Sequence, residues 1–437
     1  MTLFHRRLIY ITFIIIFLVA SPLIVLYTMG YRYNFTKGRV QKTGILKITS
    51  LPRSADIYLN GVKNSNQTPA KIEKVLPGDY EIKLSKNGYF DWQKKLAVYE
   101  NGTTFAENVI LWKQGQPLTL STTSPSSWLV SPDKNIIAFA NDKNISLLDV
   151  NSGIFGEISG GNVAIITTLV AQGEVQLISW SPSGRYLLVQ ASPMDYYLID
   201  TIAKNNKKIT GKNYTNLKWD STVDNLYGLN KSGLWQIDLS SLKTKLITNK
   251  IGGQNFYFYN RYIYWLNNQA LSRQTINSQS AVEKIAELSC SVGCQINAIK
   301  DGRALVLDSA NNNLFIVDLN RQLKTIVASA QNLSWLNDNS LIFYNEFEIY
   351  IFNFAKDSPE LITRLGTPIN AAIWHPEGRH LIFSSDGKIK IIELDNRELR
   401  NIIDIASSQA NFLTIDRAGN NLYYGIDKQG IFKLNIK

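Results

Sequence analysis

Cys290 and Cys294 are the two cysteines of the chain. Two thiols this close in sequence form a local disulfide in an oxidising compartment and stay free in a reducing one. They do not make a zinc site alone, because a structural zinc ion takes four ligands and the chain has no second cysteine pair or histidine cluster. The sequence therefore favours a disulfide outside the cytoplasm, with two free thiols as the alternative.

The histidines and carboxylates do not match a catalytic motif. His5 lies near the N-terminus, His375 in a predicted turn and His380 at the start of a predicted strand. Glu346 and Glu348 resemble strand-edge and turn residues. No Gly-x-Ser-x-Gly, P-loop, dinucleotide or His-Glu-x-x-His motif occurs. We therefore predict no catalytic residue, no cofactor and no metal.

The chain is basic, with 46 Lys and Arg against 35 Asp and Glu, and a net charge of +11. A basic surface attracts anionic partners such as phospholipid headgroups, wall polymers, acidic proteins or nucleic acid. The lysines are scattered, and the densest group, Lys204, Lys207 and Lys208, fits a solvated hairpin tip. Nucleic acid is therefore not a predicted partner.

A unit of about forty residues recurs through the last three quarters of the chain, which is typical of β-propeller blades. Each unit has an opening residue, apolar in all copies but the last, then a polar turn, a strand, and a second strand with a polar closing residue. The opening residues are Trp128, Trp180, Trp219, Tyr257, Ala298, Trp335, Trp374 and Thr414, and the closing residues are Asp149, Asp200, Asp238, Asn277, Asp318, Asn353, Glu393 and Asn435. Eight units predict eight blades, and seven stays open if the degenerate fourth or fifth copy has another role.

Both columns of residues have a structural interpretation. We expect the tryptophans to pack between neighbouring blades and the polar closing residues to cap tight turns. A ring of carboxylates that binds metal is not favoured, because Asn and Glu occupy much of the second column.

Three polar turns resemble the turn of TolB-like and WD-repeat-like propellers. They are Ser-Pro-Asp133, Ser-Pro-Ser-Gly184 and His-Pro-Glu-Gly378. The resemblance spans residues 118–437 and implies a propeller. Members of those families mostly bind proteins, and some propellers surround enzyme active sites.

An uncharged apolar run from Leu8 to Met29 is long enough to cross a bilayer once. Tyr10 and Tyr27 lie near its ends, where aromatic anchors are expected. The rival interpretation is a signal peptide cleaved at Ala20-Ser21, but the cleavage pattern is poor and the apolar run continues beyond it. The sequence favours an uncleaved membrane anchor.

Residues 44–111 predict a small β-sandwich. Ile45, Ile48, Ile57, Leu59, Ile82 and Leu84 are expected apolar strand positions, and Asn60-Gly61 is a strong hairpin signal. The order of turns and strands resembles a PEGA domain, although Asp79 departs from its central turn. The matching residues are Pro52, Ala55, Ile57, Tyr58, Gly61, Thr68, Pro69, Pro77, Gly78, Tyr80, Gly88 and Tyr89. The resemblance implies a non-catalytic, surface-exposed module of bacterial or archaeal envelope proteins.

The flanking charges conflict with an outward orientation. Arg6 and Arg7 precede the apolar run, whereas four basic residues follow it between Arg32 and Lys42. That count alone places the C-terminal side in the cytoplasm, but the rule weakens when a large domain follows a first helix. Because the PEGA resemblance points outward, we expect a single-pass plasma membrane protein with an extracytoplasmic bulk.

We thus predict an all-β protein behind one transmembrane helix. The expected parts are a stub and anchor at 1–30, a spacer at 31–43, the PEGA-like sandwich at 44–112, a linker at 113–127 and the propeller at 128–437. The predicted function is binding or scaffolding in the cell envelope, with a protein or wall polymer docked on a propeller face. The loops Gly153–Gly173 and Cys290–Cys294 are the expected contacts. The alternatives are a glycan-acting hydrolase or lyase and an assembly factor for envelope proteins.

Overall fold

The computed structural model describes residues 3–437 except 36–37, 151–162, 169–173, 252–254, 268–269, 277–280, 291–293, 322, 328–329 and 338. The chain divides into two compact units. The first contains residues 1–115 together with 395–403 and 437, and the second contains 116–394 and 404–436. Most of the predicted contact loop Gly153–Gly173 lies outside the described residues. The closing residue Asn277 also lies outside them.

Helix α1 (Leu3–Thr28) begins the first unit and is its apolar segment. It has 26 residues and no buried residue, and an 18-residue stretch of it has a mean hydropathy of 2.8, so it is long and apolar enough to cross a membrane. At 1.5 Å per residue the helix is about 39 Å long, against about 30 Å for a bilayer core. The hydroxyl group of Thr12 donates to the carbonyl oxygen of Leu8 (2.9 Å), so this polar group is satisfied within the helix.

The segment expected to be a spacer instead contains a hairpin of β1 (Tyr31–Asn34) and β2 (Arg39–Lys42). The two strands are short, and alternate side chains point to opposite faces. Asn34 and Gln41 on one face are buried, whereas Tyr33 and Val40 on the other are about half exposed.

Two sheets form the rest of the first unit, with strand orders β6-β3-β9 and β5-β4-β7-β8. The strands are β3 (Gly44–Leu51), β4 (Asp56–Leu59), β5 (Val62–Gln67), β6 (Ala70–Val75), β7 (Gly78–Ser85), β8 (Trp92–Val98) and β9 (Thr103–Ile110). Of the predicted apolar strand positions, Ile48, Ile57, Ile82 and Leu84 are fully buried. Ile45 is not, since side chains alternate along a strand and β3 turns Leu46 and Ile48 inward.

Asn60 and Gly61 form the two-residue turn between β4 and β5, as predicted. Both have positive φ, 49° and 79°, and Leu59 pairs with Val62 across the turn. This is the backbone geometry that favours Asn-Gly in tight hairpins.

The described residues of the second unit form eight four-stranded antiparallel sheets. The first four consist of β11 (Ser127–Val130), β12 (Ile136–Asn141), β13 (Asn144–Asp149) and β14 (Val163–Thr168); β15 (Gln176–Trp180), β16 (Tyr186–Ser192), β17 (Asp195–Asp200) and β18 (Asn205–Ile209); β19 (Asn216–Trp219), β20 (Leu226–Asn230), β21 (Gly233–Ile237) and β22 (Thr244–Thr248); and β23 (Phe256–Tyr259), β24 (Tyr262–Asn267), β25 (Ala270–Thr275) and β26 (Glu283–Glu287).

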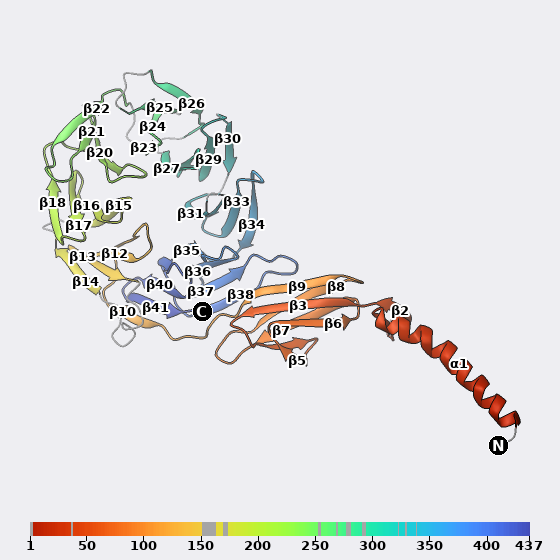
Figure 1. Cartoon of the computed structure of the whole chain (residues 1–437). Coiled ribbons are helices and arrows are strands. Elements are labelled where there is room, and N and C mark those ends of the chain that lie inside the picture. The colour runs from red at the N-terminus through yellow and green to blue at the C-terminus, as the bar shows by residue number, and fades with distance from the viewer. Residues whose placement is uncertain are drawn as a thin grey trace. The chain divides into compact units, whose positions relative to one another are not determined.

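The last four sheets continue the same up-and-down order. They consist of β27 (Gln295–Lys300), β28 (Arg303–Asp308), β29 (Asn313–Asp318) and β30 (Leu323–Val327); β31 (Asn332–Asn337), β32 (Ser340–Tyr344), β33 (Glu348–Asn353) and β34 (Ser358–Arg364); β35 (Ile369–Trp374), β36 (His380–Ser385), β37 (Lys388–Glu393) and β38 (Ile402–Ala406); and β39 (Phe412–Ile415), β40 (Asn421–Ile426) and β41 (Gly430–Asn435) with β10 (Leu118–Ser121). Figure 1 shows the sheets arranged as a ring, with first strands such as β15, β23 and β31 toward the centre.

The ring closes through a strand from each end of the second unit. Strand β10 pairs with β41, so that Leu118 lies opposite Lys433 and Thr119 opposite Phe432. The first strand of the unit thus completes the sheet made by its last three strands. These backbone hydrogen bonds join the two ends of the unit and hold the ring closed.

The hydrophobic core of the second unit lies between successive sheets. In one cluster Ala138 and Ile145 pack with Leu177, Trp180 and Leu187 of the next sheet. Further clusters join other neighbouring pairs around the ring. The first six sheets therefore bury both faces, which explains the apolar runs in their second strands.

Candidate functional site

The opening residues all lie on the first strand of a sheet. The indole nitrogen of Trp180 on β15 donates to the carbonyl oxygen of Leu129 on β11 (3.4 Å), and that of Trp374 on β35 donates to Ser334 on β31 (3.2 Å). In the same column Trp128 stacks on Phe412, Trp219 on Tyr186 and Trp335 on Phe354, with ring centroids 6.0, 6.3 and 5.5 Å apart. Trp180 and Trp374 thus join neighbouring sheets by hydrogen bonds as well as by packing.

Several closing residues accept hydrogen bonds from the turn that follows the third strand. A carboxylate oxygen of Asp238 accepts from the amides of Ser240 (3.1 Å) and Ser241 (2.7 Å), and one of Asp318 accepts from Asn320 (2.9 Å) and Arg321 (3.0 Å). Hydrogen bonds from the Ser240 hydroxyl and the Ser241 amide hold the pKa of Asp238 well below its usual range. These carboxylates therefore cap turns.

Asp200 has a similar place at the end of β17. It accepts from the amides of Ile202 (3.1 Å) and Ala203 (3.0 Å) and pairs with Arg185 (2.7 Å), which lowers its pKa. Asp149 and Glu393 end β13 and β37, respectively. Within the described part of the chain, no group of three or more His, Cys, Asp or Glu side chains is placed to hold a metal ion.

His375 and His380 converge on one carboxylate, Glu377. Oxygen Oε1 of Glu377 lies 3.2 Å from Nδ1 of His375 and 2.5 Å from Nδ1 of His380, and Oε2 lies 3.1 Å from Nε of Arg379. Burial alone would raise the pKa of Glu377, but hydrogen bonds from the two histidines hold it well below its usual range. Sequence reasoning missed this cluster, although its members lie within six positions.

The Glu377 cluster also contacts the next sheet. Nε2 of His375 lies 3.0 Å from the carbonyl oxygen of Gly419, in the turn between β39 and β40. A Cβ atom on Gly419 would lie 2.6 Å from that nitrogen, so the close approach requires glycine. The contacts connect two turns of the ring, and we assign the cluster a structural role.

Antiparallel connections place the turns of each sheet on two opposite sides of the ring. One side has the turn between the first and second strands and the turn between the third and fourth, for example residues 220–225 and 238–243. We call this side the Asp224 face. The other side has the turn between the second and third strands and the connections between sheets, for example 309–312 and 288–294. We call it the disulfide face.

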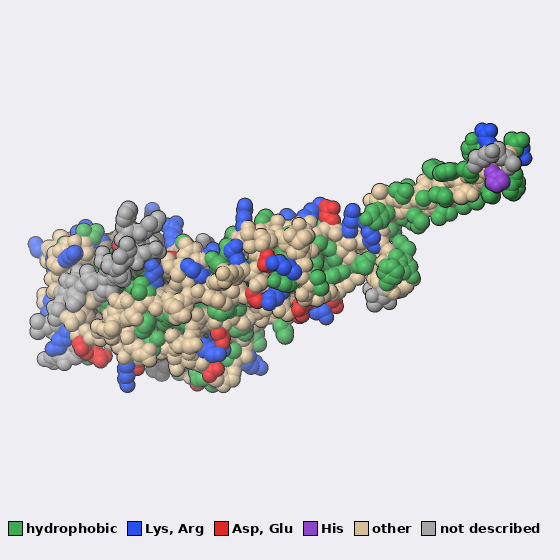
Figure 2. Space-filling view, turned by 90° about the horizontal axis from the view of Figure 1, so that it is seen from below, with side chains coloured by type: hydrophobic (Ala, Val, Ile, Leu, Met, Phe, Trp, Pro, Cys, Tyr) green, Lys and Arg blue, Asp and Glu red, His purple; other side chains and the backbone are tan. Residues whose placement is uncertain are grey.

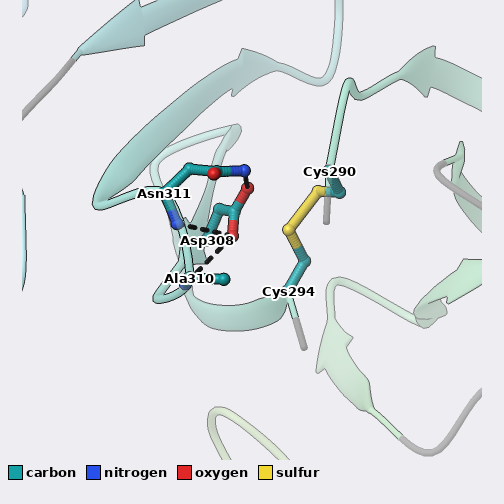
Figure 3. The surroundings of a disulfide bond; sticks show 5 residues. All are labelled: Cys290, Cys294, Asp308, Ala310 and Asn311. Atoms are coloured by element: carbon teal, nitrogen blue, oxygen red, sulfur yellow. Dashed lines mark hydrogen bonds between the residues drawn. A yellow bond between two sulfur atoms is a disulfide. The ribbon is translucent and has the colours of Figure 1, made fainter. Parts of the chain in front are cut away.

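The structure joins Cys290 and Cys294 by a disulfide on this second face (Figure 3). Their Cα atoms are 6.0 Å apart, and Cys290 is buried in the core between two sheets. Beside the bond, the buried Asp308 accepts from the amides of Ala310 (3.2 Å) and Asn311 (3.3 Å). The disulfide therefore lies beside the turn that follows β28, and the carboxylate of Asp308 stabilises that turn by accepting hydrogen bonds from its amides.

Two neighbouring grooves lie on the Asp224 face. One has a volume of 660 Å³ and the other 550 Å³, and Asn225 and Gln236 line both. The first groove also contains Asp220 and Arg261, and the second contains Asp224 and Lys243. Asp224 accepts hydrogen bonds from the amide (3.0 Å) and hydroxyl (2.5 Å) of Ser183 in the preceding sheet. Charges of both signs and two shared amides suit a polar partner.

A largely buried lysine lies on the first strand of the same sheet. Nζ of Lys218 donates to Oδ1 of Asn255 (3.3 Å) and lies 5.7 Å from the centre of the Tyr257 ring. Burial lowers the pKa of Lys218 to about 8. Since burial disfavours the charged form, this lysine is partly neutral in mildly alkaline solution.

Comparison with known proteins agrees with this architecture. Residues 43–110 match the PEGA domain family. The C-terminal WD40 domain of Sif2 is similar at 13% identity over 74% of this chain and 98% of that domain, with a TM-score of 0.53. Sqt1 of Saccharomyces cerevisiae is similar at 10% identity over 74% of this chain and 99% of that chain, with a TM-score of 0.52. No curated protein matches the chain.

These similarities indicate a β-propeller protein with an additional small β-domain. The chain contains a PEGA domain followed by a WD40-like β-propeller, and both sequence resemblances are confirmed. The structural likeness concerns the fold alone, because identity is low.

Proposed function

We propose that this protein is a membrane-anchored, extracytoplasmic scaffold whose propeller binds a protein partner on the Asp224 face. The observation that supports the docking surface is the pair of grooves that share Asn225 and Gln236. Their backbone belongs to sheets held by core packing on both sides, so little ordering entropy is lost on binding. The eight four-stranded sheets among the described residues support an eight-bladed ring.

Two further features support the anchored, outward arrangement. Helix α1 has the length and hydropathy of a single membrane span, and we propose that it stays uncleaved. The Cys290–Cys294 disulfide favours an oxidising compartment, because cytosolic thiols are kept reduced. The proposed activity is binding, without catalysis.

Site-specific photocrosslinking in cells tests the docking face. A photoreactive residue at Lys243, which is exposed in the second groove, is expected to give a discrete protein adduct. The matched control carries the photoreactive residue in place of Ile326. That side chain is 52% exposed on the outer strand β30 and lies outside the grooves. Adducts of equal yield at both positions, or none at Lys243, would contradict protein docking on this face. A glycan adduct at Lys243 would assign the face to a wall polymer instead.

A further inference from the structure

The hairpin after α1 has an exposed apolar face that does not pack in the hydrophobic core of the first unit. Tyr33 pairs with Val40 across the hairpin, and these side chains are 50% and 53% exposed. Phe35 follows on the same face, is 89% exposed, and contacts the Tyr33 ring edge-on with centroids 5.0 Å apart. The opposite face buries Asn34 and Gln41, so the hairpin presents its apolar side outward.

Side-chain and backbone contacts fix this hairpin at the end of the helix. Nη1 of Arg32 donates to the carbonyl oxygens of Tyr27 (2.8 Å) and Tyr31 (2.7 Å), and its guanidinium lies 3.6 Å from the centre of the Tyr27 ring. The amide and the hydroxyl of Thr43 both donate to the carbonyl oxygen of Gly30 (3.0 and 2.9 Å). The hairpin therefore cannot move far from the C-terminal end of α1.

Basic groups accompany the apolar face. Lys42 lies over the Tyr31 ring at 5.6 Å, and Lys74 lies over the Tyr27 ring at the same distance. Arg39 pairs with Asn34 and so lies on the opposite face of the hairpin, where its guanidinium is 4.0 Å from the carboxylate of Glu100. Aromatic rings next to lysines and arginines at the end of a membrane span are the side chains expected at the headgroup level.

We propose that the β1–β2 hairpin docks on the bilayer that α1 spans, with Tyr33, Phe35 and Val40 inserted among the lipid headgroups and Lys42 and Lys74 paired with anionic lipid. The proposal rests on the proposed anchoring role of α1. Only Met29 and Gly30 separate the helix from β1, so the hairpin lies at the membrane surface once the helix is inserted. Figure 2 shows that hydrophobic side chains cover the helix and also gather beside its end. The hairpin would hold the first unit against the surface.

Lipid quenching of a fluorescent label tests the insertion. The full-length chain with Phe35→Cys, its native disulfide intact, is labelled and reconstituted in phosphatidylcholine vesicles with and without phosphatidylglycerol. The control label is at Ile202→Cys, which is 73% exposed in the second unit. Spin-labelled lipid near the headgroups is expected to quench label 35 several-fold more than label 202. Both positions are exposed, so neither change disturbs the core.

The remaining outcomes distinguish a failure of the hairpin proposal from a failure of the proposal that α1 anchors the protein in the membrane. If carbonate washing leaves the protein in the vesicles but label 35 is as accessible to water as label 202, the hairpin proposal is wrong and the anchor stands. A label shielded from water but not quenched by lipid would mean contact with protein and would also refute it. Release of the protein by carbonate would contradict both proposals.

A second variant tests the charge. Lys42→Gln combined with Lys74→Gln is expected to remove the additional quenching that phosphatidylglycerol causes, because each basic residue contributes about a five-fold preference for an anionic surface. Equal quenching in the two lipid mixtures before substitution would refute the pairing with anionic lipid.

Discussion

Gly430 lies so close to Ser121 that a Cβ atom on the glycine would be 2.0 Å from the serine carbonyl oxygen. The contact is in the sheet that closes the ring, where β10 pairs with β41. Gly430 also has a φ of 117°, which favours glycine. Closure of the propeller thus depends on one residue without a side chain.

Substitution of Gly430 by Ala is therefore expected to lower the free energy of unfolding by about 1–3 kcal/mol, since backbone atoms must shift. Denaturant unfolding of the full-length chain in detergent measures the change. Gly366→Ala is the control, because a Cβ there meets no atom within 4 Å, and it is expected to have little effect. Equal stability of the two variants would show that the closing sheet tolerates the shift.

The Glu377 cluster predicts an acid-sensitive propeller. The folded-state pKa of Glu377 lies below its unfolded value, so the stabilisation is present above pH of about 4.5 and is lost as the pH falls toward the folded pKa. Glu377→Gln is expected to cost about 1–3 kcal/mol at neutral pH, because His375 and His380 lose their charged acceptor. The difference in the free energy of unfolding between the natural protein and this variant is expected to become smaller as the pH falls below about 4.5.

Thermal unfolding between pH 3 and pH 7 measures that difference. Glu174→Gln is the control at an exposed position. A Glu377→Gln cost that stays constant across the range would mean that the carboxylate charge makes no contribution.

Lys218 predicts a pH dependence of the same sense in a different range, at alkaline pH. Its folded pKa of about 8 is below the ordinary 10.5, so the unfolded chain binds more protons between these values. This group therefore adds stability as the pH rises from 8 to 10.5, by roughly 3 kcal/mol at most.

Lys218→Met should remove this contribution. The unfolding free energy of the natural protein minus that of the variant is measured from pH 7 to pH 10.5, which cancels the titration of other groups. This difference in unfolding free energy is expected to rise with pH. A flat profile would mean that burial does not destabilise the charged form of Lys218 in the folded protein.

The disulfide predicts a redox-dependent stability. Reduction is expected to lower the free energy of unfolding by about 2 kcal/mol, because the bond closes a short loop. The double variant Cys290→Ser, Cys294→Ser should match the reduced protein and should not respond to dithiothreitol. A response of the double variant to the reductant would assign the effect to something other than this bond.

The regular parts of the fold could be predicted because they depend on local pattern. Alternating strands and turn residues at a spacing of about forty residues predict blades, and Asn60-Gly61 predicts its hairpin from backbone preference alone. The buried face of a strand was not predicted, since only the packing of β3 decides whether Leu46 or Ile45 points inward.

The candidate site was beyond local reasoning, because its residues come from different repeats. Asp224 meets Ser183, and His375 meets Gly419, across more than forty positions of sequence. Trp180 likewise finds its acceptor on another sheet. No spacing within one repeat encodes these contacts.

The sequence by itself thus determined the apolar helix, the PEGA module and the repeated β-units, since hydrophobic period and turn chemistry act over short stretches of chain. Only the tertiary structure decided the closing pair of β10 and β41, the two grooves that share Asn225 and Gln236, and the outward face of the β1–β2 hairpin. These features arise when distant segments pack side by side, and that packing depends on the shape and burial of the whole unit.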